Sequence, residues 1–164
     1  MVDDTSVDLA VGAEAPDFTL AGVDPRTGEF RDFSLSEYRG HPVVLVFYPA
    51  DNSPVCTRQL AEYTASVADF ETLDAQVLAI SPQDPATHLE FSRDQGGFGF
   101  PLLADVDREV GRRFGVLGLL DLYRRCTFVV DPDGRIAYIH RYLGPALEFR
   151  PAEELLAALA PAAD

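Results

Sequence analysis

The chain has 164 residues, 47% hydrophobic and 24% charged, which suits one globular domain whose core is large enough to need no disulfide. Its formal net charge of −14 argues against nucleic-acid and anionic-membrane partners, because no basic stripe is available to neutralise phosphates. No apolar run approaches the ~20 residues needed to cross a bilayer, and the acidic N-terminus lacks a secretory pattern, so we expect a cytoplasmic protein.

The basic residues have an unusual composition. All 13 are arginine, and the chain contains no lysine. Abundant Asp and Glu without Lys is typical of a protein kept soluble by acidic charge at high salt. A GC-rich genome that replaces Lys by Arg without physical cause explains the composition equally well, so both interpretations stay open.

Hydrophobic periodicity and turn residues predict alternating strands and helices. Residues 1–10 are expected to form a flexible acidic lead-in to a single domain over 11–164. The first elements expected are, in chain order, an extended segment over 13–20, a turn over 24–28, a hairpin arm over 30–33, a helical turn over 34–38, a strand over 42–48 and a helix over 54–72. The later ones are a strand over 76–81, a helix over 85–94, a strand over 101–105, a helix over 107–114, a strand over 125–131, its hairpin partner over 135–142 and a closing helix over 151–159.

This order of elements predicts the fold class. Strand–helix–strand units followed by a hairpin and a helix indicate an α/β sandwich, with a mixed central sheet and helices on both faces. Strand 76–81 is apolar throughout its middle and is therefore expected to be central and parallel. The turn over 131–134 makes the last two strands an antiparallel pair.

The segment from Pro49 to Cys56 is the most informative part of the chain. Ser53 fits the N-cap of the helix that follows strand 42–48, and Pro54 fits the first helical position. Cys56 then falls in the first turn, near unpaired amides and the positive end of the helix dipole. This placement favours the thiolate, which is the nucleophilic form. The alternative for Cys56 is a buried thiol that acts as a small hydrophobe.

Five blocks follow one another along the chain: Val11–Leu20, Leu45–Pro49, Ser53–Thr57, Phe100–Asp105 and Arg125–Asp131. These blocks, in this order, give the chain a resemblance to the peroxiredoxins, the alkyl hydroperoxide reductase and thiol-specific antioxidant family. The active-site block follows the family pattern Pro-x-x-x-Thr/Ser-x-x-Cys. The chain looks closest to bacterioferritin-comigratory-type or one-cysteine members.

The resemblance implies a thioredoxin-like three-layer sandwich and a thiol-dependent peroxidase that reduces hydrogen peroxide and organic hydroperoxides without a cofactor. Cys56 would attack the peroxide and become a sulfenic acid. Ser53 would hydrogen-bond the sulfur or the peroxide, although capping alone also explains it, and Pro49 would shield the pocket. Arg125 would hold the thiolate and stabilise charge on the peroxide oxygens, as a rigid cation does well. A solvated surface arginine is the alternative, and Arg124 competes for the role.

Recycling of the sulfenic acid departs from much of the family. One branch places a second cysteine five residues after the first, where this chain has Ala61, and another places it near the C-terminus, where residues 143–164 contain none. Cys126 remains, but if Arg125 faces the active site, strand alternation sends Cys126 to the other face of the sheet. We therefore expect core packing for Cys126 and reduction of Cys56 by thioredoxin or a low-molecular-weight thiol.

The remaining residues bear on alternative functions and on possible partners. A peroxide sensor, or a thiol–disulfide exchange module, is the alternative function, although no Cys-x-x-Cys pair is present. Gln59 stands where many relatives carry Glu and is assigned no catalytic role. Scattered histidines predict no metal site. Residues 115–123 are rich in apolar side chains and are expected to form a homodimer surface, the alternative being an internally packed loop.

Overall fold

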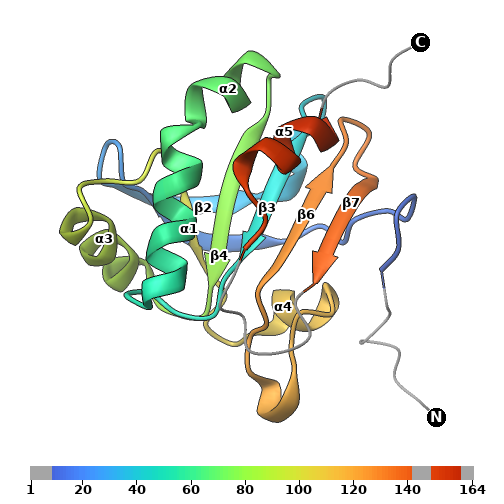
Figure 1. The fold of residues 1–164 in the computed structure, drawn as a ribbon. Helices are drawn as coiled ribbons and strands as arrows, with labels where there is room; N and C mark the ends of the chain where they lie inside the picture. The colour runs from blue at the N-terminus through green and yellow to red at the C-terminus, as the bar shows by residue number, and fades with distance from the viewer. Residues whose placement is uncertain (1–8, 142–148, 160–164) are drawn as a thin grey trace.

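The computed structural model describes residues 9–141 and 149–159 (Figure 1). Residues 1–8 of the predicted lead-in lie outside the described residues, as does Tyr142 at the end of the predicted last strand. Leu9, at the end of the lead-in, packs half-buried against the core. Within the described ranges, no helix is both long and apolar enough to span a membrane.

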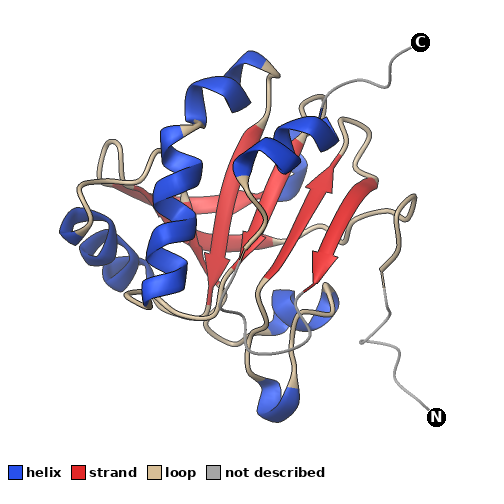
Figure 2. Ribbon diagram, viewed as in Figure 1, coloured by secondary structure: helices blue, strands red, loops and turns tan. Residues whose placement is uncertain are grey.

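In the described part of the chain, seven strands form one mixed sheet in the order β2-β1-β5-β4-β3-β6-β7 (Figure 2). The strands are β1 (Thr19–Asp24), β2 (Glu29–Ser34), β3 (Val43–Phe47), β4 (Gln76–Ser81), β5 (Leu102–Ala104), β6 (Cys126–Val130) and β7 (Ile136–Arg141). The middle strand β4 is parallel to β3 and β5, and the other pairs are antiparallel. The predicted mixed sheet with a central parallel strand is therefore confirmed.

The sheet is wider on the N-terminal side than the sequence predicts. The extended segment expected to end at Leu20 continues as β1 to Asp24, and β1 pairs with both β2 and β5. Gly22 permits this, because a Cβ at its position would lie 2.7 Å from the carbonyl oxygen of Leu102. A glycine inside a strand often marks such a close approach of another backbone.

Helices lie on both faces of the sheet: α1 (Pro54–Ala65), α2 (Val67–Thr72), α3 (Pro85–Asp94), α4 (Glu109–Arg113) and α5 (Ala152–Leu159), with short 3-10 turns at Leu35–Tyr38 and Leu119–Asp121. Two predicted helices need correction. The helix expected over 54–72 is broken at Ser66, whose backbone (φ −103°, ψ 9°) ends α1 and begins α2. The helix expected from residue 107 begins at Glu109, because Arg108 has the left-handed φ of 61°.

Two hydrophobic clusters, one on each face of the sheet, make the three layers. Val44 and Val46 of β3 pack in the first cluster, beneath α1, α2, α3 and α5. Val43, Leu45 and Phe47 point the other way, into the second cluster with α4. In Figure 1, α1 and α5 lie in front of the sheet. The predicted sandwich is confirmed, and each face of β3 belongs to a different core.

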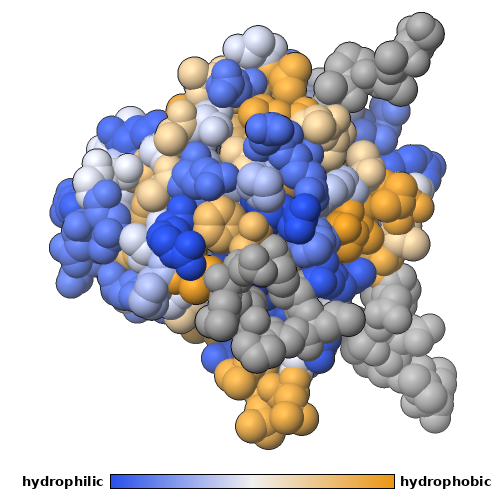
Figure 3. Space-filling view, viewed as in Figure 1, coloured by the Kyte–Doolittle hydropathy of each residue, from blue (hydrophilic) through white to orange (hydrophobic). Residues whose placement is uncertain are grey.

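The segment over 115–123 is part core and part surface. Val116 and Tyr123 are buried, so the ends of the segment are packed internally. Leu119 and Leu120 are each 82% exposed and Leu122 is 57% exposed. Figure 3 shows the resulting hydrophobic tip, which projects below α4 in this view.

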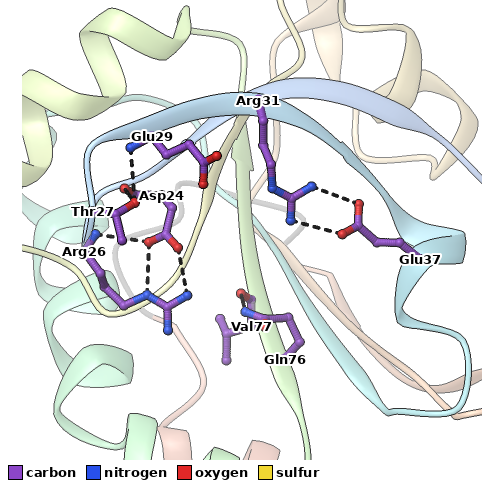
Figure 4. A network of polar contacts seen from close by, with 8 residues as sticks. All are labelled: Asp24, Arg26, Thr27, Glu29, Arg31, Glu37, Gln76 and Val77. Carbon is purple, nitrogen blue, oxygen red and sulfur yellow. Dashed lines mark hydrogen bonds and ion pairs between the residues drawn. The ribbon is translucent and has the colours of Figure 1, made fainter.

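The edge hairpin of β1 and β2 carries a network of charged side chains (Figure 4). The Arg26 guanidinium donates to both oxygens of Asp24 at 3.0 Å and holds the pKa of that carboxyl below its usual value. Arg31 pairs with Glu37, whose carboxylate also accepts from the Ser34 amide at the start of the first 3-10 turn. Charged side chains on an edge strand discourage pairing with another chain.

Candidate active site

The start of α1 has the predicted capping geometry. Ser53 is the N-cap with an extended backbone (φ −74°, ψ 142°), and Pro54 is the first helical residue. The Cys56 amide donates to Ser53 Oγ at 3.2 Å, and Thr57 Oγ1 donates to the Ser53 carbonyl at 2.8 Å. Cys56 is therefore the third residue of the helix, where the dipole and the free amides favour an anionic side chain.

Arg125 lies against the sulfur of Cys56. Its Nη2 donates to Cys56 Sγ at 3.3 Å, although 69 residues separate the two in sequence. The sheet makes this contact, because Arg125 directly precedes β6 and β6 pairs with β3, the strand that leads into the Cys56 loop. Arg125 is only 2% exposed, unlike a solvated surface arginine. A buried cation at this distance stabilises a thiolate.

Gln59 holds the other arm of the same guanidinium. Arg125 Nη1 donates to Gln59 Oε1 at 2.5 Å, Gln59 Nε2 donates to Tyr63 Oη at 3.4 Å, and Tyr63 Oη donates to the Arg150 carbonyl at 2.5 Å. Gln59 and Tyr63 are fully buried. Gln59 gives Arg125 an acceptor that carries no negative charge, so it orients the cation without neutralising it.

Gln59 has no predicted role, and the structure brings it into the site. One signal was available: Cys56, Gln59 and Tyr63 recur at spacings of three and four, which places them on one face of a helix. A buried glutamine on that face needs a partner. The sequence alone could not name Arg125 as that partner.

Arg124, the competing arginine, points elsewhere. Its amide donates to the Val116 carbonyl at 2.7 Å, and its side chain packs over Gly118. Pro49 is half-buried in the loop after β3, and its shielding role stays a prediction. The structure therefore brings together Ser53, Cys56 and Arg125 of the predicted site residues.

Cys126 lies on the other face of the sheet. It is paired in register with Phe47 of β3 and belongs to the second hydrophobic cluster, whereas Cys56 belongs to the first. Both thiols are buried, and neither is part of a disulfide. The expected alternation along β6 is confirmed, and the body of the sheet separates the two sulfurs.

Over residues 9–141 and 149–159, no group of three or more His, Cys, Asp or Glu side chains is placed to hold a metal ion. The site itself offers a thiol at a helix start, a buried guanidinium, and an amide that orients it. Such an arrangement suits nucleophilic attack by sulfur on an electrophile that accepts hydrogen bonds as it gains charge.

Known proteins share this arrangement of sequence and fold. The AhpC/TSA family model matches residues 11–139. A Mycobacterium tuberculosis protein whose name places it among the peroxiredoxins is 41% identical over an alignment of 135 residues that covers 78% of this chain and 82% of that protein. The solved structure of Mycobacterium tuberculosis AhpC has a TM-score of 0.83 at 27% identity and covers 93% of this chain and 92% of that one. The mitochondrial 2-Cys peroxiredoxin from Plasmodium falciparum has a TM-score of 0.81 at 25% identity, with 92% of each chain covered.

The match covers the residues around the sulfur of Cys56. Residues 11–139 include the capped helix start, Cys56, Gln59 and Arg125. The structural likeness extends over nearly the full length of both chains and confirms the expected thioredoxin-like sandwich. The chain belongs to the AhpC/TSA family, the peroxiredoxins, and is a thiol-dependent peroxidase.

Proposed function

We propose that Cys56 is the peroxidatic cysteine and that the protein reduces hydrogen peroxide and organic hydroperoxides by a one-cysteine mechanism. The observation that carries the proposal is the 3.3 Å contact from Arg125 Nη2 to Cys56 Sγ at the start of α1. The thiolate attacks the terminal peroxide oxygen, an S–O bond forms as the O–O bond breaks, and water or an alcohol leaves after taking up a proton. Cys56 becomes a sulfenic acid.

Arg125 and the helix start share the electrostatic work of this step. Negative charge moves from sulfur to the leaving oxygen, and the guanidinium beside the sulfur is already oriented by Gln59 before the reaction begins. Donors fixed in advance cost no reorganisation, and one such donor is worth about 3–4 kcal/mol in the transition state. Ser53 holds the first turn in place and is proposed to hydrogen-bond the peroxide.

An external thiol is proposed to return the sulfenic acid to the thiolate. One equivalent of thiol forms a mixed disulfide with Cys56 and releases water, and a second equivalent releases the reduced protein and an external disulfide. The Plasmodium falciparum neighbour is titled a 2-Cys peroxiredoxin, but here the only other cysteine lies across the sheet. A disulfide needs Cα atoms within about 7 Å and converging side chains, so Cys126 is poorly placed to resolve Cys56.

Peroxide consumption with dithiothreitol tests this function. We expect loss of turnover in Cys56→Ser and full turnover in Cys126→Ser. Intact mass after one equivalent of peroxide should show one added oxygen on Cys56, and a Cys56–Cys126 disulfide in high yield would overturn the one-cysteine mechanism. Oxidation without turnover by any thiol would favour the peroxide-sensing alternative.

The exposed tip of Leu119, Leu120 and Leu122 is the proposed homodimer surface. Exposed apolar side chains of this size gathered at one place mark interfaces. Light scattering should give a dimer for the wild type and a monomer for Leu119→Asp/Leu120→Asp. The cytoplasmic location stays a prediction from the sequence.

A further inference from the structure

A second buried polar cluster lies beneath the loop that carries Ser53, and the proposed chemistry does not use it. Asp51 Oδ2 and His88 Nδ1 are 2.7 Å apart, with side chains 2% and 0% exposed. Asp51 Oδ1 accepts from Tyr48 Oη at 2.7 Å. His88 Nε2 lies 2.9 Å from the carbonyl oxygen of Leu103. The cluster thus ties the loop after β3 to α3 and to β5.

The contacts fix where the hydrogen atoms of the cluster lie. The Leu103 carbonyl can only accept, so His88 Nε2 carries a hydrogen. Burial and the nearby Asp51 charge hold the pKa of Tyr48 well above its usual value, so Tyr48 stays a hydroxyl and donates. One further hydrogen must lie between Asp51 Oδ2 and His88 Nδ1, because two lone pairs at 2.7 Å would repel. Every polar atom of the pair is then satisfied.

The backbone of the same loop is held independently. The Asp51 amide donates to Gln83 Oε1 at 3.0 Å, and Ser81 Oγ donates to the same oxygen at 2.7 Å. The next residue, Asn52, has the left-handed φ of 65° and turns the chain into the Ser53 cap. Both the side chain and the backbone of Asp51 are therefore anchored one turn before the helix that bears Cys56.

We propose that Asp51 and His88 form a positioning pair that fixes the Tyr48–Ser53 loop, and through it the Ser53 cap and Cys56, for attack on peroxide. Neither residue is proposed to touch the substrate. Ser53 Oγ accepts from the Cys56 amide, so a shift of the loop displaces the start of α1 from Arg125. A misplacement of about 1 Å can slow a reaction about 100-fold. The inference rests on the proposed role of Cys56.

The chain offers a matched control for this pair. His41 Nδ1 and Asp74 Oδ2 lie 2.6 Å apart, but their side chains are 52% and 73% exposed. This pair has the same chemistry, and it joins the segment before β3 to the turn before β4 rather than to the Cys56 loop. An exposed pair contributes little to stability. Asp74→Ala should therefore leave the peroxide reaction unchanged.

Asp51→Ala and Asp51→Asn separate positioning from general stability. Asp51→Ala removes the contacts to Tyr48 and His88, and it should slow oxidation of reduced Cys56 by hydrogen peroxide about 10- to 100-fold in stopped flow. Asn at position 51 keeps every contact, since its oxygen accepts from Tyr48 and its NH₂ donates to Nδ1 of a neutral His88. Asp51→Asn should therefore react within about threefold of the wild type.

A third variant keeps the test decisive if Asp51→Ala does not fold. Gln83→Ala frees the Asp51 amide and the Ser81 hydroxyl, and it leaves no buried charge because the glutamine side chain is neutral. It should slow oxidation about threefold to tenfold, less than Asp51→Ala because the side-chain contacts remain. Circular dichroism should show each assayed variant folded at the assay temperature.

The outcomes distinguish this inference from the proposed function. A wild type that does not react with peroxide would reject the role of Cys56 itself. A reactive wild type with an equally fast, folded Asp51→Ala would overturn the positioning pair alone. A rate for Asp51→Asn as low as that of Asp51→Ala would overturn it too, because hydrogen-bond geometry would then not be what the loop requires.

Discussion

The two cysteines have the same side chain and the same complete burial; Cys126 lies in β6, and Cys56 lies in α1, which follows the neighbouring strand β3. Cys56 stands at a helix start with a guanidinium 3.3 Å from its sulfur. Cys126 packs with Phe47 and Phe128 in the other core, and its cross-strand neighbour Arg141 directs its guanidinium to the Phe128 ring and the Phe114 carbonyl. The difference teaches that two equally buried thiols can have very different surroundings. A buried cation beside the sulfur is what we expect to make Cys56 the reactive one.

Removing the Arg125 cation from beside Cys56 should have the largest effect on the reaction with peroxide. Arg125→Gln keeps hydrogen-bond donors but loses the charge, and it should lower the second-order rate constant with hydrogen peroxide about 100- to 1,000-fold. Stopped-flow oxidation of the reduced protein measures this constant. The absorbance of the thiolate at 240 nm should fall at neutral pH in the same variant.

Arg124→Gln is the matched control for this change. The two arginines are adjacent, but Arg124 packs over Gly118, away from Cys56. Its loss should leave the rate constant within about twofold of the wild type, as expected for a residue outside the site. Equal losses in both variants would mean that net charge, rather than the contact with the sulfur, activates Cys56.

Changing Gln59, the neutral partner of Arg125, should have the next largest effect on the rate of Cys56 oxidation. Gln59→Ala leaves Arg125 Nη1 without its glutamine acceptor, and the loss of a hydrogen bond to a charged group, worth about 1.5–3 kcal/mol, should slow oxidation about tenfold or more. Gln59→Glu keeps an acceptor in place but adds a negative charge beside the cation. It should react faster than Gln59→Ala and hold a smaller thiolate fraction at pH 7 than the wild type.

The result would be contradicted by a larger thiolate fraction in Gln59→Glu than in the wild type. Such a finding would mean that a carboxylate at this position strengthens the hold of Arg125 on the sulfur. The neutral amide would then not be the better partner.

Local signals made one part of this site predictable. The Ser53 cap, Pro54 and the position of Cys56 follow from a few adjacent residues, and the placement of Cys126 follows from alternation along one strand. The Gln59–Arg125 contact spans 66 residues and needs the pairing of β3 with β6, which no local pattern specifies. The family resemblance identified Arg125 as a site residue, but it assigned no role to Gln59.

The fold likewise has features that local sequence predicts and features that it does not. The apolar runs of β3 and β4, the capped start of α1 and the bounds of α3 were predictable from sequence. The break at Ser66 and the left-handed Arg108 were not, because tertiary packing selects these backbone conformations over the local helical pattern. The reach of β1 to Asp24 depends on Gly22 meeting a strand some eighty residues away.

Changing the other cysteine should affect stability and leave the reaction unchanged. Cys126→Ser places a hydroxyl in an apolar core and should lower the free energy of unfolding by about 1–3 kcal/mol. Cys126→Ala removes the sulfur without adding a polar group, so comparison of the two variants isolates the cost of the hydroxyl. Urea unfolding measures both, and the peroxide rate constant should match that of the wild type. A slower reaction in Cys126→Ala would mean that packing on one face of the sheet affects the reactivity of Cys56 on the other.

Acid should lower the free energy of unfolding through an ion pair at α5, a helix that packs in the same hydrophobic cluster as Cys56. Hydrogen bonds from Arg150, and then from Tyr138, lower the pKa of Glu154 to about 2. Because this folded-state pKa lies below the ordinary value of 4.5, the pair stabilises the protein fully above about pH 4.5, and the contribution is lost as pH falls toward 2. Glu154→Gln should therefore show a shallower loss of stability between pH 4.5 and 2 than the wild type, measured as the urea midpoint at each pH.

Glu153→Gln, at the neighbouring position on α5, provides the control, and it should keep the acid slope of the wild type. Arg150 also connects this ion pair to the Cys56 site. Its carbonyl accepts from Tyr63 Oη, which in turn accepts from Gln59 Nε2. The polar chain that orients Arg125 thus ends at the residue whose side chain pairs with Glu154. Identical acid slopes in Glu154→Gln and Glu153→Gln would remove this pair as a source of acid sensitivity. A shallower slope in Glu154→Gln alone would identify this pair as a source of acid sensitivity next to the chain of contacts that reaches Arg125.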